Sequence, residues 1–385
     1  MSEVFARYDF GLDEDQEERA RKLHERSVVV DALHQGPLGY RDYPQAMVEQ
    51  AQEAYAEHGE YRRAMDELGR ALQDRERETQ GAASRERLAQ AGLTGITREV
   101  FFFDARAALS SFASVIDQFD RLPWLVKALR AEDFVRAKDQ GLHAGFVNTQ
   151  WPDGLVDDPA IVDVLHGLGL RMFQLTYNVM NGIGAGCTER TDAGVSRLGA
   201  RFIERMNQVG VIVDTGHCGH QTTLDACEVS TAPVIASHTA AAAVYEHDRG
   251  KSDEEIRALA GTGGVIGVVA VPFFLSGDVE ASIETILDHI DHIAGLVGPQ
   301  HVAIGTDWPM QHAKWTLREL MPPWTRQLGF DDSHGLDMAR NLVGFDDIRD
   351  YPNITRGLVA RGYTDDDIEG ILGGNFLRVF EQVCG

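Results

Sequence analysis

Eight short apolar runs, separated by longer stretches with helical spacing, constrain the fold of this chain more than any other feature of its sequence. Each run has the length of a buried strand, and the stretches between the runs repeat their apolar residues with the period of a helix. This alternation is typical of βα units around a parallel sheet, and eight such units close a (β/α)8 TIM barrel, which is an α/β fold. The runs lie at 27–33, 94–103, 142–148, 170–178, 210–216, 232–238, 263–271 and 301–307.

The length of 385 residues suits one such barrel with insertions, so we predict a single domain over 1–385. The first two runs are separated by the long, charged stretch that contains residues 40–93, which predicts a helical insertion at the barrel mouth. Helices are also expected on both sides of the fifth run, the first of them ending at Gly210.

The charge of the chain excludes two classes of partner. Sixty acidic against 36 basic residues give a formal charge of −24, which repels nucleic acids and anionic membrane surfaces alike. The four cysteines, at 187, 218, 227 and 384, are too few and too irregular for a disulfide framework. Residues 1–27 are charged throughout and lack the apolar segment of a secretion signal, so a cytoplasmic location is predicted.

Polar residues at the ends of the apolar runs are the candidate functional residues, because catalytic groups of such barrels project from the C-terminal strand ends. They are Asp31, His34, Asn148, Tyr177, Asn178, His217, His238 and Asp307. His217 and His238 follow neighbouring strands and are predicted to bind one cation through neutral imidazole nitrogens. Asp307 is expected to bind metal or to take a proton from water. Cys218 and His220 are weaker candidates.

From about residue 140 to its end, the chain resembles the membrane dipeptidase (renal dipeptidase) family. The resemblance lies in GVIVDTGHCG, APVIASHTAAA, HDRGKSDEEIRALAGTGGVIGV, HIDHIAGLVGPQHVAIGTDW and the tail YPNITRGLVARGYTDDDIEGILGGNFLRVF. It implies a (β/α)8 metallohydrolase with a two-zinc centre that cleaves dipeptides and tolerates a D-residue on the C-terminal side. It further implies that His217 and His238 hold one zinc, that Asp307 belongs to the other, and that Arg249 holds the substrate carboxylate.

Three departures from the family pattern modify this expectation. Leu33 and Gln35 stand where the family has a His-x-Asp pair of zinc ligands, and Asn148 stands where it has the glutamate that bridges the metals. Tyr177 replaces a histidine expected to polarise the scissile carbonyl, and its phenol can donate the same hydrogen bond. These departures resemble a divergent bacterial branch of the family that lacks the His-x-Asp pair.

The predicted function is therefore a dipeptidase-like, metal-dependent hydrolase of a small carboxylate-bearing substrate. At most one divalent metal, zinc, is expected on His217 and His238, and a second zinc is not. Asp307, Tyr177 and Asn148 are predicted as catalytic residues. Arg249, Asn178 and His34 are predicted to bind substrate. A lyase or a metal-free small-molecule binding protein of the same barrel family is the alternative, and a homodimer is a possible assembly.

Overall fold

A computed structural model gives the fold of most of the chain. It describes residues 8–34, 77–102, 104–278, 281–307, 328–337 and 342–385, together with positions 46, 49, 50, 52, 53, 56, 74, 325, 326 and 340. Most of the predicted insertion at 40–93 and the position of Gln35 lie outside the described residues, so the insertion stays a prediction. At its C-terminal end, the stretch contains the helix α4 (Ala82–Gln90).

Eight parallel strands form the barrel, in the order in which they occur along the chain. They are β1 (Val29–Val30), β2 (Leu93–Phe101), β4 (His143–Trp151), β5 (Leu170–Gln174), β6 (Ile212–Asp214), β7 (Val234–Ala241), β9 (Ile266–Val268) and β11 (Val302–Ile304). The ring closes between the last strand and the segment after the first, where Ala32 N–H donates to Ile304 O at 2.8 Å and Asp307 N–H donates to Leu33 O at 2.9 Å. The predicted fold class is confirmed.

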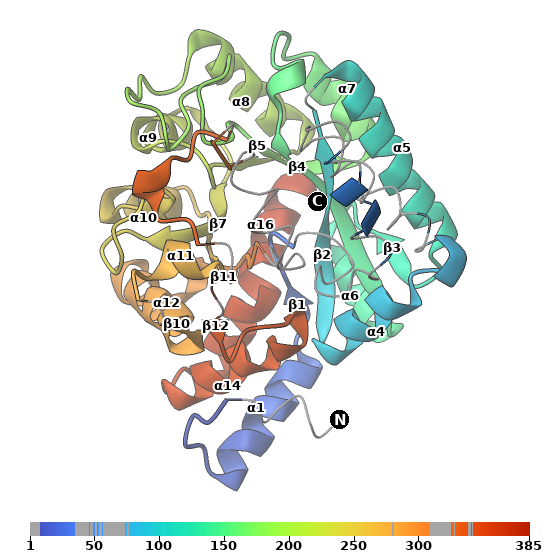
Figure 1. The fold of residues 1–385 in the computed structure, drawn as a ribbon, viewed down its shortest axis with the longest axis vertical. Helices are drawn as coiled ribbons and strands as arrows, with labels where there is room; N and C mark the ends of the chain where they lie inside the picture. The colour runs from blue at the N-terminus through green and yellow to red at the C-terminus, as the bar shows by residue number, and fades with distance from the viewer. Residues whose placement is uncertain are drawn as a thin grey trace.

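Helices surround the strands, and α16 lies inside the ring of outer helices in the view of Figure 1. The helices besides α4 are α1 (Glu14–Arg26), α5 (Ala105–Arg121), α6 (Ala131–Asp139), α7 (Ile161–Leu168), α8 (Arg197–Val209), α9 (His220–Val229), α10 (Asp253–Gly261), α11 (Pro272–Leu275), α12 (Ile283–Val297), α14 (Pro352–Ala360), α15 (Asp365–Glu369) and α16 (Asn375–Cys384). Helix α8 begins after the Ser196 cap and ends where Gly210 adopts φ 86°, as predicted. Short extra strands lie outside the ring, namely β3 (Leu125–Lys127), β8 (Gly250–Lys251), β10 (Ala281–Ser282) and β12 (Leu342–Val343).

The barrel interior is apolar at one end and polar at the other. Phe146, Met172, Ile212 and Ile235 point inward and pack with aromatic residues of α6 and α16, which close the bottom of the barrel. Side chains alternate along a strand, so the residues two positions further on face the same interior. These are Asn148, Gln174, Asp214 and Ser237, all buried. The polar layer therefore lies at the C-terminal end of the strands, where barrels of this kind carry their sites.

Three predicted strand ends next to candidate residues were wrong. Strand β7 continues to Ala241, so His238 lies within the strand rather than after it. Strand β4 continues to Trp151, so Asn148 lies within the strand rather than after it. Its parallel pairing with β2 and β5 extends the strand beyond the last apolar residue, because polar side chains can face the barrel interior. Strand β5 ends at Gln174, so Tyr177 and Asn178 lie in the loop that follows, and Asn178 has a φ of 56°. The predicted order of strands is unaffected.

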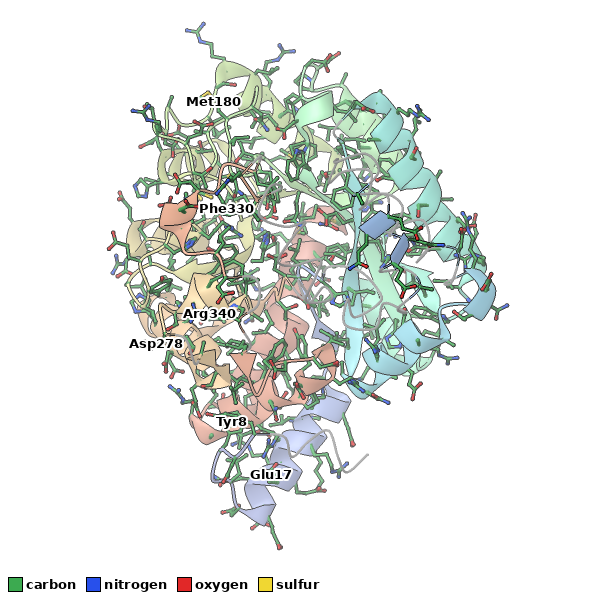
Figure 2. All side chains as sticks on the ribbon, viewed as in Figure 1. Tyr8, Glu17, Met180, Asp278, Phe330 and Arg340 are labelled. Atoms are coloured by element: carbon green, nitrogen blue, oxygen red, sulfur yellow. The ribbon has the colours of Figure 1, made fainter. Side chains whose placement is uncertain are left out.

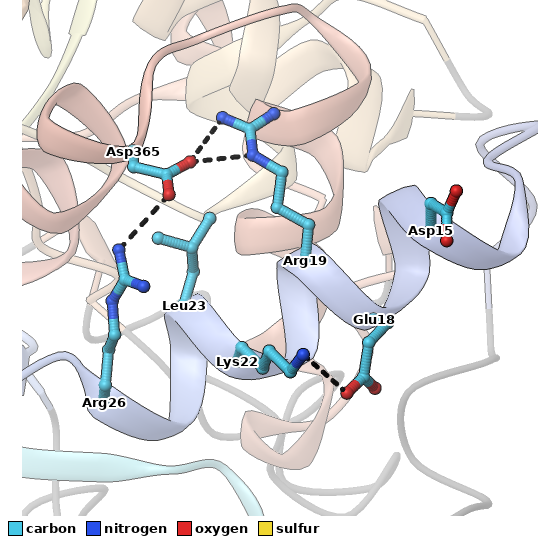
Figure 3. Close-up of a pocket in the computed structure, with 7 residues that line it drawn as sticks. All are labelled: Asp15, Glu18, Arg19, Lys22, Leu23, Arg26 and Asp365. Carbon is cyan, nitrogen blue, oxygen red and sulfur yellow. Dashed lines mark hydrogen bonds and ion pairs between the residues drawn. The ribbon is translucent and has the colours of Figure 1, made fainter.

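The N-terminal helix α1 is fixed to the C-terminal part of the chain by ion pairs. Arg19 and Arg26 both contact Asp365 of α15, at 2.7 and 3.3 Å (Figure 3). Tyr8 and Glu17 lie together at the lower end of Figure 2, where the buried Arg356 donates to the Tyr8 carbonyl and pairs with Glu17. These contacts cover the outside of α14. None of the helices among the described residues is long and apolar enough to cross a membrane.

Candidate active site

The two predicted metal ligands meet at the mouth of the barrel. His217 lies in the turn after β6, His238 lies in β7, and their Nε2 atoms are 2.8 Å apart. On its other side, His217 Nδ1 is 2.6 Å from Asn178 Oδ1. His238 Nδ1 is 2.8 Å from Ser237 Oγ, which in turn donates to Asp214 Oδ2 at 2.6 Å. The outer nitrogen of each ring is therefore tied to the surrounding structure.

These outer bonds determine which nitrogen of each ring carries the proton. An amide oxygen can only accept, so His217 Nδ1 donates to Asn178. The only hydroxyl proton of Ser237 goes to Asp214, so His238 Nδ1 donates to Ser237. Both Nε2 atoms are then unprotonated and direct their lone pairs at one another, an arrangement that favours a cation between them. Burial, together with the charge of Arg249, holds the pKa of both imidazoles well below the ordinary value and keeps them neutral.

An aromatic stack holds His217 from one side. The Tyr177 ring lies over the His217 ring at a centroid distance of 3.9 Å, and Trp151 lies on the other face of Tyr177 at 4.2 Å. Burial raises the pKa of the Tyr177 phenol well above its usual value, so the phenol keeps its proton and can donate it in a hydrogen bond. The structure thus places Tyr177 against His217, one of the two predicted metal ligands, and its role in catalysis stays a prediction.

Arg249 lies beside the two histidines. Its guanidinium is 1% exposed and donates to the carbonyl oxygens of Gly216 and His238, while its Nε has no hydrogen-bond partner among the described residues. Phe274 lies beneath the guanidinium at 5.3 Å. No carboxylate pairs with Arg249 in the described part of the chain, and a buried cation of this kind favours an anionic ligand.

A segment near the C-terminal side of the barrel covers the loop that carries Arg249. Phe330, labelled in Figure 2, packs on Phe274 with their ring centroids 6.0 Å apart. His334 contacts carboxylates on both sides, Asp248 at 3.0 Å and Asp331 at 2.9 Å. These contacts join residues 328–337 to the Arg249 loop.

The opposite wall of the barrel contains polar side chains without partners. Asn148 is fully buried, and neither atom of its amide has a hydrogen-bond partner among the described residues. Both ring nitrogens of the buried His34 also lack hydrogen-bond partners among the described residues, and Nδ1 is 3.7 Å from Asp31 Oδ2. The side-chain oxygens of Gln150 and Gln174 also lack partners within the described chain. Since buried polar atoms are normally hydrogen-bonded, this wall is suited to a polar ligand or to water.

Glu99 is a residue of this wall that the sequence analysis missed. It lies on β2 opposite Asn148 in the parallel register, and it faces the interior because its neighbour Arg98 points outward to Gln118 of α5. Burial, and then the charge of Asp307, raise the pKa of the Glu99 carboxyl to about 8. The sequence does contain an indication of this residue, because an acid inside the apolar run TGITREVFFF is unusual. The prediction missed it because it was restricted to residues at strand ends, and Glu99 lies in the middle of its run.

Asp307 follows β11 with a φ of 53°, a strained conformation for a residue other than glycine. Its backbone N–H donates to Leu33 O, so closure of the barrel holds this residue in place. Leu33 itself is buried and contributes to the apolar interior. Among the described residues, no three or more His, Cys, Asp and Glu side chains group as a metal site would require.

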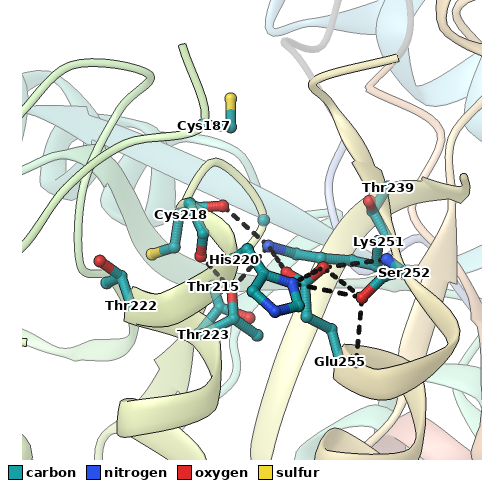
Figure 4. A network of polar contacts seen from close by, with 12 residues as sticks. Cys187, Thr215, Cys218, His220, Thr222, Thr223, Thr239, Lys251, Ser252 and Glu255 are labelled. Atoms are coloured by element: carbon teal, nitrogen blue, oxygen red, sulfur yellow. Dashed lines mark hydrogen bonds and ion pairs between the residues drawn. The ribbon is translucent and has the colours of Figure 1, made fainter. Parts of the chain in front are cut away.

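The two weaker candidates of the fifth run belong to a buried polar network behind the site, drawn in Figure 4. Cys218 accepts a hydrogen bond from Thr176, and burial raises the pKa of its thiol to about 12. His220 begins α9 and contacts Glu255 at 3.2 Å. The centre of the network is Lys251, which donates to Cys218 O at 2.8 Å and pairs with Glu255 at 3.1 Å. Neither Cys218 nor His220 contacts the facing Nε2 atoms.

An eight-stranded parallel barrel with two convergent histidines at its C-terminal mouth defines a class of protein, the metal-dependent hydrolases. The sequence model of the membrane dipeptidase family (peptidase family M19) matches residues 17–318 and 329–384. The chain belongs to this family.

Curated relatives are dipeptidases by name. Dipeptidase tcpJ of Claviceps purpurea is 27% identical over 259 residues, which is 66% of this chain and 55% of that protein. An uncharacterized dipeptidase of Schizosaccharomyces pombe is 31% identical over 58% of this chain and 49% of its own length. The matches thus span about half the length of these relatives.

Solved structures share the fold over nearly the whole chain. An amidohydrolase from Pseudomonas aeruginosa has a TM-score of 0.74 at 25% identity, covering 94% of this chain and 98% of its own. The probable dipeptidase PvdM of the same organism has a TM-score of 0.69 at 21% identity, covering 97% and 99%.

Proposed function

We propose that this chain hydrolyses the amide bond of a small, dipeptide-like substrate that ends in a free carboxylate. A single divalent metal, zinc, would be held by His217 and His238. The observation that carries the proposal is the pair of Nε2 atoms 2.8 Å apart, whose outer nitrogens are both tied as donors. Neutral imidazoles fixed in this way by surrounding groups are typical zinc ligands. The names of the relatives support dipeptides as the substrate class.

The residues around the histidines have separate tasks in this proposal. Arg249 would bind the substrate carboxylate through its remaining N–H groups, which places the amide bond between Arg249 and Asp307. A bound divalent metal would supply a Lewis acid and lower the pKa of water near it. Asp307 would accept a proton from the attacking water and return it to the leaving nitrogen as the C–N bond breaks. Tyr177 would donate a hydrogen bond to the carbonyl oxygen as it gains charge, and Asn148, Asn178 and His34 would orient the substrate.

The alternative of a metal-free binding protein differs from this proposal in a measurable way. It predicts that carboxylates bind but that no amide is cleaved after zinc is added. The homodimer and the cytoplasmic location also stay predictions, as does the absence of nucleic-acid and membrane partners.

A substrate panel tests the proposal. Protein purified without a histidine tag is stripped with a chelator, reconstituted with zinc and assayed on dipeptides and on the same dipeptides with amidated C-termini. Hydrolysis of the free acids alone is expected. Arg249→Lys should raise KM at least about tenfold, because a lysine cannot form a bidentate pair. The exposed Arg190→Lys is the matched control and should leave KM unchanged. Equal cleavage of acids and amides, or no cleavage, would contradict the proposal.

A further inference from the structure

Glu99 is placed where an incoming ligand meets it. It belongs to β2, it lies opposite Asn148 in the register, and it is half-buried within the barrel while Asn148 is fully buried. Thr97, two residues earlier on the same strand, faces the interior as well and hydrogen-bonds both backbone groups of His34. The side chain of Glu99 therefore points into the barrel interior and not to the outer surface.

The electrostatic surroundings of Glu99 contain no cation among the described residues that influence it. Its contacts are a hydrogen bond from Gln150 and the charge of Asp307, which opposes ionisation. An acid whose pKa is raised to about 8 by burial and by another carboxylate gains stability from any cation that enters. Near pH 7 this carboxyl is therefore mostly protonated, and a cation beside it would favour its ionised form.

Two neighbours of Glu99 have hydrogen-bond acceptors without partners in the described chain. They are Gln150, through its Oε1, and Asn148, through its Oδ1. The Oε1 of Gln174 also lacks a partner in the described chain, but it lies near Gly216, on the side of the histidines. Acceptors of this kind around a carboxyl suit a group with several N–H donors, such as a primary ammonium with three.

Arg249 and Glu99 therefore lie on different sides of the barrel mouth. Arg249 is beside His217 and His238, and its charge reaches Tyr177, which also experiences the charges of Glu99 and Asp307. A ligand with an anionic group at Arg249 and a cationic group at the β2–β4 wall would satisfy both. Because Glu99 belongs to no group that could hold a metal in the described part of the chain, a cationic substrate group is the simpler occupant.

We propose that Glu99 binds the free ammonium group of the substrate, so that the enzyme acts on unblocked, zwitterionic dipeptides and rejects N-acylated ones. This inference rests on the proposed function, because it takes the amide between the two charged groups as the bond that is cleaved. Glu99 then determines specificity, with Gln150 and Asn148 as the neighbouring acceptors.

Paired substrates test this assignment. Each dipeptide is assayed beside its N-acetyl form with the zinc-reconstituted wild type, Glu99→Gln and the exposed control Glu132→Gln. The wild type and the control should prefer the free amine about 100-fold in kcat/KM. Glu99→Gln should lose that preference, mainly through a higher KM for the free amine, and should cleave the N-acetyl form as the wild type does. Its circular dichroism and thermal midpoint establish that it is folded.

A second readout does not depend on turnover. Binding of a phosphinate mimic of a dipeptide is measured by calorimetry at pH 7 in buffers of different ionisation enthalpy. Wild-type protein should release a proton on binding, because an ammonium group ionises Glu99, and Glu99→Gln should release less. Equal cleavage of free and acetylated dipeptides by the wild type, or an unchanged preference in Glu99→Gln, would overturn the assignment and leave the proposed function intact. Cleavage of neither form would overturn the proposed function itself.

Discussion

The two halves of the barrel mouth differ in how completely their polar groups are satisfied. On the β6–β7 side, hydrogen bonds join His238 through Ser237 to Asp214 and join His217 to Asn178, and the two imidazoles face one another through their Nε2 atoms. On the β1–β4 side, the side chains of His34 and Asn148 are buried and have no hydrogen-bond partners among the described residues. The first half is complete except for a cation between the histidines, whereas the second needs a ligand to satisfy it.

Two aspartates at strand ends, Asp214 and Asp31, make the same contacts in both halves. The halves therefore differ in the loops that follow the strands and not at the strand ends themselves. Asp214 accepts from the backbone N–H groups of Gly216 and Ser237 and from the Ser237 hydroxyl. Asp31 accepts from the backbone N–H groups of Leu33 and Thr306 and from the Thr306 hydroxyl. Both join their strand to a neighbour in the same way. A histidine stands three residues after each aspartate, but His217 faces a second histidine at 2.8 Å, whereas the ring nitrogens of His34 have no hydrogen-bond partner among the described residues.

The largest effect on stability is expected on the β6–β7 side, whose polar groups are hydrogen-bonded. Lys251 and Glu255 are a buried ion pair, and although burial would raise the pKa of Glu255, Lys251 and Ser252 lower it to about 2. Lys251→Met should lower the free energy of unfolding by about 3–5 kcal/mol, because Glu255 is left buried without its partner. Urea titration measures this. The double variant Lys251→Met with Glu255→Gln should recover much of the loss, and a double variant as unstable as the single one would contradict the account.

Metal affinity should respond to the bond that orients His238. Ser237→Ala removes the acceptor of the Nδ1 proton, and loss of such a supporting group typically weakens metal binding by about 10–100-fold. Competition with a chromophoric chelator measures the zinc affinity. Ser110→Ala, an exposed position of α5, serves as the control and should bind zinc as the wild type does. Unchanged affinity in Ser237→Ala would mean that His238 is held by other contacts.

The pH dependence of stability should distinguish the unsatisfied side. The pKa of Glu99 is raised to about 8 in the folded protein, above the value of 4.5 in an unfolded chain. The stability that this proton contributes is present below pH 4.5 and is lost as the pH rises through 8. Glu99→Gln should therefore gain on the order of 2 kcal/mol relative to the wild type between pH 6.5 and pH 9. Urea titrations at both pH values measure the difference in unfolding free energy between variant and wild type. A difference that does not change with pH would show that the Glu99 carboxyl is exposed to water and has an ordinary pKa.

The smallest expected effect is an increase in stability, whereas most substitutions in a protein core lower it. Asn148→Leu replaces a buried amide without partners by an apolar group of similar volume, which should raise the free energy of unfolding by about 1 kcal/mol. Activity should fall in the same variant, because the acceptor for the substrate is lost. Thermal unfolding and an assay of the same preparation measure both. A loss of stability in Asn148→Leu would show that its amide is hydrogen-bonded in the protein.

The barrel and the proximity of His217 and His238 could be predicted from the sequence, for a physical reason. Apolar runs of strand length determine which segments form the sheet, and chain order determines that His217 and His238 lie on neighbouring strands. Arg249 and Asp307 were found because they follow strands in recognisable motifs. The tautomers of the histidines could not be predicted, because they depend on contacts with Asn178 and Ser237.

The unsatisfied half was harder to predict because it lies within strands. Asn148 was expected after its strand, and Glu99 was missed altogether. The register between β2 and β4 determines which interior residues of the two strands lie opposite one another, and the sequence does not show that register. A polar residue inside an apolar run therefore indicates a polar neighbour without showing which residue it is. Gly216 and Thr306, which complete the aspartate contacts, are likewise recognisable only once the strands are paired.

The central claim is that only one half of the mouth is built to hold a metal. Zinc content per chain, measured by elemental analysis on untagged protein after reconstitution and gel filtration, tests it most directly. The account predicts one zinc per chain in the wild type and in Asn148→Leu, and none in His238→Ala. The control His166→Ala, a half-buried residue of α7, should retain the metal. Two tightly bound zinc ions per chain, or one that survives in His238→Ala, would contradict the account.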